Sequence, residues 1–275
     1  MTPSLRQLRF LSALADELHF GRAAAACNVS QSTLSSGLKD LEAALGVTLA
    51  ERGNRHVILT PIGEEIAARG RGVLAAAEDI SELAAQHAGP LAGDLRLGAI
   101  PTVGPYLLPA ALARVRRDYP DLRLYLREEL TESLLDGVRA GRLDAALIAL
   151  PFETGELVTE QLFDDGYQLA APRAHDLTRV GELDGRELAE QSLLLLERGH
   201  CLQGHALQAI PEVPPQRDES FAATSLSTLL AMVQEGLGLT LVPQLAVDGG
   251  IAGAYDVALV PLRRVCPRHV VLAWR

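Results

Sequence analysis

The sequence predicts a mixed α/β protein in which a small helical head and one long helix precede a larger body of strands and helices. Three observations predict this fold class. Apolar residues recur every three or four positions through residues 4–45, and residues 61–86 keep a helical pattern. After residue 93, short apolar segments typical of strands alternate with helical segments. We therefore expect a head over residues 1–60, a linker helix over 61–89 and a body over 93–275.

The composition is that of an ordinary globular chain, since 48% of its 275 residues are hydrophobic and 22% are charged. No segment approaches the roughly 20 apolar residues of a membrane helix, and the first residues, MTPSLRQLRFLSALADE, carry acids where a signal peptide needs an apolar core. We therefore expect a cytoplasmic protein without membrane contact. The net charge of −10 is uneven: residues 1–60 carry six basic and five acidic side chains, so the remainder carries −11. A near-neutral head permits, without requiring, nucleic-acid binding.

The pattern in the head predicts a helix, a short helix, a turn and a third helix. Leucines at helical spacing mark the first helix within residues 4–18, and an alanine-rich segment at 22–27 marks the second. Asn28 then begins a tight turn. Ser30 is a suitable N-cap for the third helix, and Gly46 is a suitable C-terminal stop.

The exposed N-terminal half of the third helix carries small, uncharged groups that can form hydrogen bonds. Such a face fits the major groove of DNA, where a glutamine can pair with adenine and hydroxyls can reach bases or phosphates. A β wing predicted over residues 51–60 brings two arginines to the phosphates. The candidate DNA-binding residues are Gln31, Ser32, Thr33, Ser35, Lys39, Arg52 and Arg55. The alternative is a solvated helix face with no such role.

The linker helix begins at Thr60-Pro61, a cap followed by proline at the first helical position. Its apolar residues alternate spacings of four and three, which is a heptad seam interrupted once by Arg69. The seam consists of Ile62, Ile66, Val73, Ala76, Ile80 and Leu83. At 1.5 Å per residue the helix is a rod of roughly 40 Å. Its seam needs a partner, either a second copy, which implies a dimer, or the body of the same chain.

The body follows a hinge at residues 88–93 and is predicted to form two α/β lobes. Strands and helices alternate, which is typical of a parallel sheet with crossover helices. Lobe I takes about 93–165 plus 262–275, and lobe II takes about 166–261. Two such lobes leave a cleft between them, where ligands usually bind.

The three cysteines, Cys27, Cys201 and Cys266, are too few and too scattered for a disulfide framework. No pair of CxxC motifs or Cys/His quartet indicates zinc, so we expect no metal and no cofactor. Cys201 and His205 stand four residues apart, which leaves a metal pair without a third ligand as one alternative. By itself, Cys201 could equally be a small buried hydrophobic residue.

Residues 23–52, AAAACNVSQSTLSSGLKDLEAALGVTLAER, are similar to the winged helix-turn-helix of the LysR family of transcriptional regulators. The segments LGAIPTVGPYLLP (97–109), GHCLQGHAL (199–207) and FAATSLSTLLAMVQEGLGLTLVP (221–243) resemble the OxyR group of hydrogen-peroxide sensors within it. The resemblance implies a winged helix-turn-helix, a linker helix and a two-lobed effector domain like a periplasmic binding protein. It also implies a homo-oligomeric activator, a dimer or tetramer, with a double-stranded DNA operator, hydrogen peroxide and RNA polymerase as partners.

The same resemblance implies that Cys201 is the peroxidatic cysteine. A thiolate that attacks one peroxide oxygen needs a lowered pKa, and the leaving hydroxide needs hydrogen-bond donors. The donors carried over from the family are Thr102, Thr131, His200 and Arg268, and Arg268 also supplies a fixed positive charge.

The chain departs from the family at the resolving cysteine, which follows the first by nine residues and normally closes a switching disulfide. That position holds Ile210. Either the chain signals through a sulfenic acid or a mixed disulfide, or Cys266 is the alternative resolving thiol, or the protein is an engineered or ligand-sensing variant. Cys266 shares a face with Arg268 on a regular strand, although Pro267 weakens that geometry.

Two other functions remain open at this level. One is a LysR-type regulator that senses a small molecule between the lobes, with Cys201 incidental. The other is a thiol peroxidase, which the DNA-reading head argues against. Family members continue past the final strand with another helix, so we expect the chain to be shortened or to represent only the ordered part.

Overall fold

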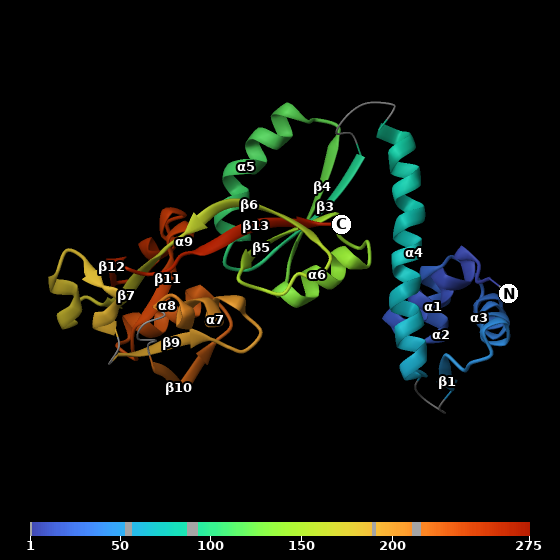
Figure 1. Cartoon of the computed structure of the whole chain (residues 1–275), viewed down its shortest axis with the longest axis horizontal. Helices are drawn as coiled ribbons and strands as arrows, with labels where there is room; N and C mark the ends of the chain where they lie inside the picture. The colour runs from blue at the N-terminus through green and yellow to red at the C-terminus, as the bar shows by residue number, and fades with distance from the viewer. Residues whose placement is uncertain (1, 53–56, 87–92, 189–190, 211–215) are drawn as a thin grey trace. The chain divides into compact units, whose positions relative to one another are not determined.

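The computed structural model describes residues 2–52, 57–86, 93–188, 191–210 and 216–275, and it is drawn in Figure 1. The chain divides into two compact units. The first comprises residues 1–90 with 139–142, and the second comprises residues 91–138 with 143–275. Among the described residues, no helix combines the length and the apolar character that crossing a membrane requires.

Three helices and a small wing form the head of the first unit. The helices are α1 (Leu5–Glu17), α2 (Phe20–Ala26) and α3 (Gln31–Leu45), and the wing pairs β1 (Ala50–Arg52) antiparallel to β2 (Val57–Leu59). Leu11, Leu14, Leu34 and Leu41 are fully buried between the helices. The predicted succession of helices and wing is therefore confirmed. The second helix begins two residues earlier than predicted, because His19 caps it through hydrogen bonds from two backbone N–H groups to Nδ1.

The ends of α3 follow the predicted capping residues. Asn28 adopts a left-handed conformation with φ of 54°, which makes the turn before the helix. Ser30 is the N-cap, and its hydroxyl accepts a hydrogen bond from the backbone N–H of Thr33 at 3.2 Å. Gly46 ends the helix with φ of 71°, a conformation that costs glycine little because it has no Cβ.

The linker helix α4 (Pro61–Gln86) packs on α1 through small residues rather than through its seam. Ala67 and Gly70 are buried, and a Cβ on Gly70 would lie 3.3 Å from the side chain of Leu8 in α1. Gly63, one turn before Ala67, is buried against the backbone of Leu49 instead. Small residues permit this close approach of two helices.

The seam of α4 lies on another side of the helix and is largely uncovered within the chain. Ile62, Val73 and Ile80 are 41%, 50% and 71% exposed, whereas Ile66 packs partly against the head. Arg69, which interrupts the seam, pairs with Glu65 at 2.9 Å. The side chain of Leu83 and the hinge residues 88–92 lie outside the described residues.

A five-stranded sheet with the order β4-β3-β5-β13-β6 forms the first half of the second unit. Its strands are β3 (Gly93–Ala99), β4 (Leu122–Glu128), β5 (Ala145–Leu150), β6 (Val158–Asp165) and β13 (Arg268–Trp274). Helices α5 (Gly104–Asp118) and α6 (Thr131–Arg139) connect β3, β4 and β5, which are parallel as predicted.

The prediction of a parallel sheet is wrong for β13, which runs antiparallel to both β5 and β6. The reason is the path of the chain. β6 leaves this sheet toward the other half of the unit and β13 returns from there, so the two strands lie side by side in opposite directions (Figure 1). No crossover helix is needed for such a return. The prediction is also wrong for most of the sheet in the second half of the unit, where three of the strands pair antiparallel.

The second half of the unit contains a four-stranded sheet with the order β11-β7-β12-β8 and a parallel pair of β9 and β10. The strands are β7 (Tyr167–Pro172), β8 (Leu183–Asp184), β9 (Ser192–Leu196), β10 (Gln216–Ala223), β11 (Thr240–Pro243) and β12 (Val257–Arg263). The helices are α7 (Cys201–Gln208), α8 (Leu226–Gln234) and α9 (Gln244–Asp248). Each half has its own buried apolar cluster, as two lobes require.

The exposed seam predicts that α4 pairs with a second copy of the chain. A glutamate in place of Val73 or Ile80 should release subunits, because an unpaired charge in an apolar helix contact costs several kcal/mol. Light scattering should show a smaller particle with unchanged helical circular dichroism, since both side chains are exposed within one chain. Ala68→Glu is the matched control, because Ala68 is exposed on α4 but lies off the seam. An oligomer that survives both seam variants would contradict the pairing.

Candidate functional site

Cys201 is the first residue of α7, at a point where the two lobes of the second unit meet. Gly199, two residues earlier, has φ of 106°, a conformation that favours glycine and turns the chain into the helix. The sequence pattern did not predict a helix at this position. Cys201 packs against the apolar cluster of the first lobe although its helix belongs to the second. The cysteine therefore lies at the junction of two cores.

A narrow, closed pocket beside the thiol is lined by four of the five predicted peroxide-site residues, and in this structure it has no room for a water-sized molecule. Its polar lining consists of Thr102, Thr131, His200 and Cys201. Thr102 and Thr131 are 2% and 1% exposed, so both hydroxyls are removed from bulk water. The remaining walls are apolar: Ile100, Pro101, Leu130 and Leu202. Arg268, the fifth predicted residue, does not line this pocket.

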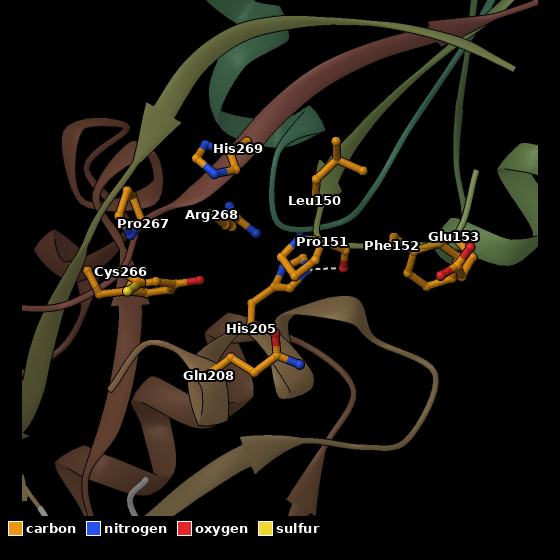
Figure 2. A pocket seen from close by; sticks show the side chains of 11 residues that line it. Leu150, Pro151, Phe152, Glu153, His205, Gln208, Cys266, Pro267, Arg268 and His269 are labelled. Carbon is orange, nitrogen blue, oxygen red and sulfur yellow. Dashed lines mark hydrogen bonds between the residues drawn. The ribbon is translucent and has the colours of Figure 1, made fainter. Parts of the chain in front are cut away.

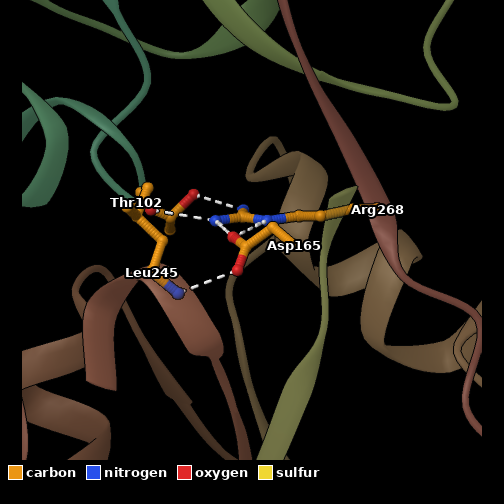
Figure 3. A network of polar contacts seen from close by, with 4 residues as sticks. All are labelled: Thr102, Asp165, Leu245 and Arg268. Atoms are coloured by element: carbon orange, nitrogen blue, oxygen red, sulfur yellow. Dashed lines mark hydrogen bonds and ion pairs between the residues drawn. The ribbon is translucent and has the colours of Figure 1, made fainter. Parts of the chain in front are cut away.

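Arg268 is fully buried and is held by a buried carboxylate, as Figure 3 shows. Its Nε and Nη2 donate to Oδ2 of Asp165 at 3.0 and 2.8 Å. Its Nη1 donates to the hydroxyl of Thr102 at 2.7 Å, and Nη2 donates to the carbonyl oxygen of Thr102 at 2.9 Å. The other oxygen of Asp165 accepts the backbone N–H of Leu245 at 2.8 Å. Three polar groups, drawn from both lobes, thus bond to one buried ion pair.

This network changes the role expected for Arg268. Its charge is balanced by Asp165, so it is not a free cation beside the sulfur. Because it donates to Oγ1 of Thr102, the hydroxyl hydrogen of Thr102 remains available to donate elsewhere. Asp165 was missed by the sequence analysis. Its only signal is the register of two crossing strands, where Asp165 and Arg268 are direct partners, and that register is not readable before the topology is known.

The electrostatics of Cys201 contradict the expected lowered pKa. Burial raises the pKa of the thiol, and this effect outweighs the influences that lower it. Those influences are the Thr131 hydroxyl, the positive charge of Arg268 and the backbone N–H groups of the first turn of α7. The hydroxyl of Thr131 has no hydrogen bond of normal geometry among the described residues, yet it lies close enough to the thiol to lower its pKa.

The two histidines beside Cys201 are both held toward their neutral form. Burial lowers the pKa of His200, and Glu197 partly opposes this effect. Burial also lowers the pKa of His205, whose Nε2 lies 3.0 Å from the carbonyl oxygen of Pro151. No group of three or more His, Cys, Asp or Glu side chains in the described part of the chain could hold a metal ion. The Cys201 and His205 pair therefore gains no third ligand there.

Cys266, the candidate resolving thiol, lies at the opposite end of α7 from Cys201. Its backbone N–H donates to the carbonyl oxygen of Ala209 at 2.7 Å. Eight residues of helical rise place Ala209 about 12 Å from Cys201 along the helix axis. A disulfide needs Cα atoms closer than about 7 Å, so α7 would have to unwind to form it. Cys266 also precedes β13, so the expected shared strand face with Arg268 is wrong.

Only some of the side chains on the predicted DNA-reading face of α3 are exposed and unengaged by the helix cap. Gln31, Ser32 and Lys39 are exposed, whereas Thr33 and Ser35 are half-buried. The hydroxyls of Ser32 and Thr33 lie 2.9 and 2.8 Å from the hydroxyl of the N-cap Ser30, so both belong to the cap. The amide of Gln31 and the ammonium of Lys39 are therefore the prominent groups. The side chain of Arg52 and all of Arg55 lie outside the described residues.

Comparisons with known proteins agree with this architecture. Residues 5–64 match the bacterial regulatory helix-turn-helix of the lysR family, and residues 88–275 match the LysR substrate binding domain. The chain is 41% identical to the HTH-type transcriptional regulator EstR of Acinetobacter baylyi, over 94% of this chain and 85% of that protein. It is 46% identical to a probable hydrogen peroxide-inducible genes activator of Streptomyces viridosporus, over 90% and 79%. A full-length OxyR variant from Pseudomonas aeruginosa has a TM-score of 0.83 and 40% identity, covering 100% and 90%.

The buried ion pair predicts a large difference between two adjacent aspartates. Asp165→Ala should lower the free energy of unfolding by about 3–5 kcal/mol, because it leaves the buried guanidinium of Arg268 unpaired. Asp164→Ala is the matched control. Asp164 forms a solvent-exposed pair with His269, so its loss should cost less than about 1 kcal/mol. Urea unfolding followed by circular dichroism measures both, and equal losses would contradict the central position of Asp165.

Proposed function

The chain belongs to the LysR family of DNA-binding transcriptional regulators, and from this premise we propose that it senses hydrogen peroxide through oxidation of Cys201. The observation that carries the proposal is the pocket itself. Its lining includes one thiol at a helix N-terminus, two buried threonines and one histidine. The relatives named for OxyR and for hydrogen peroxide-inducible genes support the choice of oxidant.

The reaction transfers one oxygen atom from peroxide to sulfur. The sulfur of Cys201 attacks the nearer oxygen, the O–O bond breaks, and the thiol becomes a sulfenic acid. The distal oxygen leaves as hydroxide and takes up the thiol proton to become water, so that thiol and peroxide give sulfenic acid and water. The thiolate is the attacking form, which makes the raised pKa of Cys201 the quantity that sets its rate.

The pocket supplies the donors that this step requires. The hydroxyl hydrogen of Thr102 is free to donate, because Arg268 already occupies its oxygen as a donor. The Thr131 hydroxyl lies against the sulfur and favours the thiolate. A neutral His200 can donate from one ring nitrogen. The pocket must open to admit even a small oxidant, and its mostly apolar walls favour an uncharged one.

Within the described part of the second unit, no other thiol lies within reach of the oxidised sulfur while α7 keeps its helical form. Ile210 is 1% exposed and cannot form a disulfide, and Cys266 lies beyond the far end of the helix. The sulfenic acid should therefore persist, or be oxidised further, or react with a thiol from outside the chain. We also propose that the regulator acts as a homo-oligomer joined through α4, with Gln31, Lys39 and the wing at the DNA.

Peroxide should add oxygen to Cys201 without forming an intramolecular disulfide. Intact mass should first show one added oxygen, trappable by a sulfenic-acid reagent, and then a second and third. The rate should increase by roughly tenfold per pH unit through neutral pH, because the raised pKa leaves the thiolate a minor form there. Thr131→Val should slow the reaction by removing a group that lowers this pKa.

Cys201→Ser should abolish the adduct, and Cys266→Ser, which leaves the pocket intact, should not. Loss of two hydrogens with a Cys201–Cys266 cross-linked peptide would contradict the proposed fate and make Cys266 the resolving thiol. Oxidation of Cys27 or Cys266 with Cys201 unchanged would contradict peroxide sensing at this pocket.

The head should read DNA bases through Gln31. Gln31→Ala should remove discrimination between operator and random DNA, whereas Lys39→Ala should weaken both alike and reduce the salt dependence by about one unit. Fluorescence anisotropy at several salt concentrations measures both effects. An equal loss on the two DNAs for Gln31→Ala would contradict base reading by this residue.

A further inference from the structure

The backbone amide of Leu202 adjoins the sulfur of Cys201. Cys201 is the first residue of α7 and Leu202 is the second, so their N–H groups belong to the first turn of the helix, where no helical partner exists. Both N–H groups lie close enough to the sulfur to lower the pKa of the thiol. The nitrogen of Leu202 is therefore within reach of an oxidised sulfur and has no helical hydrogen bond to lose.

Other reaction partners are kept from this sulfur when the pocket is closed. The closed pocket has no room for a water-sized molecule, Ile210 stands where the family has its resolving thiol, and Cys266 lies beyond the far end of α7. The remaining polar groups of the lining are two threonine hydroxyls and the ring of His200, and none of these can close a small ring with the sulfur. Among the described residues, the amide of Leu202 is thus the best-placed partner for oxidised Cys201.

We propose that the sulfenic acid of Cys201 condenses with the backbone nitrogen of Leu202 to form a cyclic sulfenamide. The nitrogen attacks Sγ, the S–O bond breaks, and the hydroxyl leaves with the amide hydrogen as water. The ring consists of Sγ, Cβ, Cα and the carbonyl carbon of Cys201 and the nitrogen of Leu202. The sulfur keeps its oxidation level, so no further oxidant is consumed. This step rests on the proposed peroxide oxidation of Cys201 and follows it.

His200 can move the proton that this condensation requires. It lines the pocket beside Cys201, and burial lowers its pKa, which keeps its ring neutral. A neutral imidazole has one nitrogen that accepts a proton and one that donates a proton. The ring can therefore take the proton of the Leu202 amide and deliver one to the leaving hydroxyl.

The ring gives the regulator a reversible oxidised state that needs no second cysteine. One molecule of a low-molecular-weight thiol opens it, forming a mixed disulfide with Cys201 and returning a hydrogen to the amide of Leu202. A second molecule then releases the Cys201 thiol and leaves as the disulfide of the small thiol. Closing the ring turns the peptide between Cys201 and Leu202 toward the sulfur, so the first turn of α7 changes conformation when the signal is received.

The other two cysteines of the chain lack such an amide and provide internal controls. Cys266 is exposed at the wall of a separate cavity and precedes Pro267, which has no amide hydrogen (Figure 2). Cys27 precedes Asn28, whose N–H already donates to a backbone carbonyl oxygen at 3.0 Å. Ring closure is therefore expected at Cys201 and not at these two positions.

Ring closure can be tested on the full chain with Cys27→Ser and Cys266→Ser, in which Cys201 is the only thiol and no intramolecular disulfide can form. The chain is exposed briefly to peroxide that carries a heavy oxygen isotope, and the excess is removed. Intact mass should show one labelled oxygen, which is then lost as labelled water, leaving the chain two hydrogens lighter. Peptide fragmentation should place this loss at Cys201 and Leu202, and dithiothreitol should restore the starting mass. The matched chain with Cys27→Ser and Cys201→Ser, which retains Cys266, should gain oxygen without losing water.

A second pair of variants, made in the chain that retains only Cys201, tests the nitrogen itself. Leu202→Pro removes the amide hydrogen at a first-turn position, where helices tolerate proline. Leu202→Ala is its control, because it loses the same buried side chain but keeps the N–H. Circular dichroism checks that both variants are folded. The labelled oxygen should be lost as water from Leu202→Ala and should stay on the sulfur in Leu202→Pro.

The outcomes separate this inference from the sensing proposal. If Cys201 gains labelled oxygen and keeps it, or gains a second and third without losing water, the ring is overturned while peroxide oxidation of Cys201 stands. Loss of water from Leu202→Pro would overturn the assignment to this nitrogen. If Cys201 gains no oxygen at all, the sensing proposal fails and the ring fails with it.

Discussion

The second unit depends on the buried pair of Arg268 and Asp165. These residues face each other on the two strands that pass between the lobes, and each is also bonded to a different lobe: Arg268 to Thr102, and Asp165 to Leu245 at the start of α9. A buried ion pair is stable only when its remaining donors and acceptors are satisfied, and here they are satisfied by both lobes. Separation of the lobes at this point would therefore break the hydrogen bonds with Thr102 and Leu245 that satisfy the buried pair.

The same pair sets the chemistry on both of its sides. Toward the thiol, it orients Thr102 and contributes a positive charge that lowers the pKa of Cys201 without overcoming burial. On its other side, the neutralised guanidinium lines a larger cavity together with His205 and Gln208 (Figure 2). The pair thus borders both the pocket of Cys201 and this cavity, and α7 borders both as well.

The parts of the fold that depend on local chemistry were predictable, and those that depend on distant partners were not. Ser30, Gly46 and Pro61 act on their own helix ends, so the head and linker helix followed from the sequence. The direction of β13 and the partner of Arg268 depend on which strands meet after the chain has crossed between lobes. The family resemblance correctly predicted four residues that line the pocket. It could not predict that burial raises the pKa of Cys201, because burial depends on how the two lobes pack around the thiol.

Ile210 explains why the proposed response must begin locally. In the family pattern this position carries the thiol that captures oxidised sulfur, but here it is a core side chain, 1% exposed and packed near Gly185. Moving it out of the core would cost roughly 1.5–3 kcal/mol of apolar burial, with no new covalent bond to offset the loss. An oxygen added to Cys201 must instead be accommodated in a pocket that, in this structure, has no room for a water-sized molecule. The neighbouring side chains must therefore move, and the displacement acts first on the N-terminus of α7, where Cys201 lies.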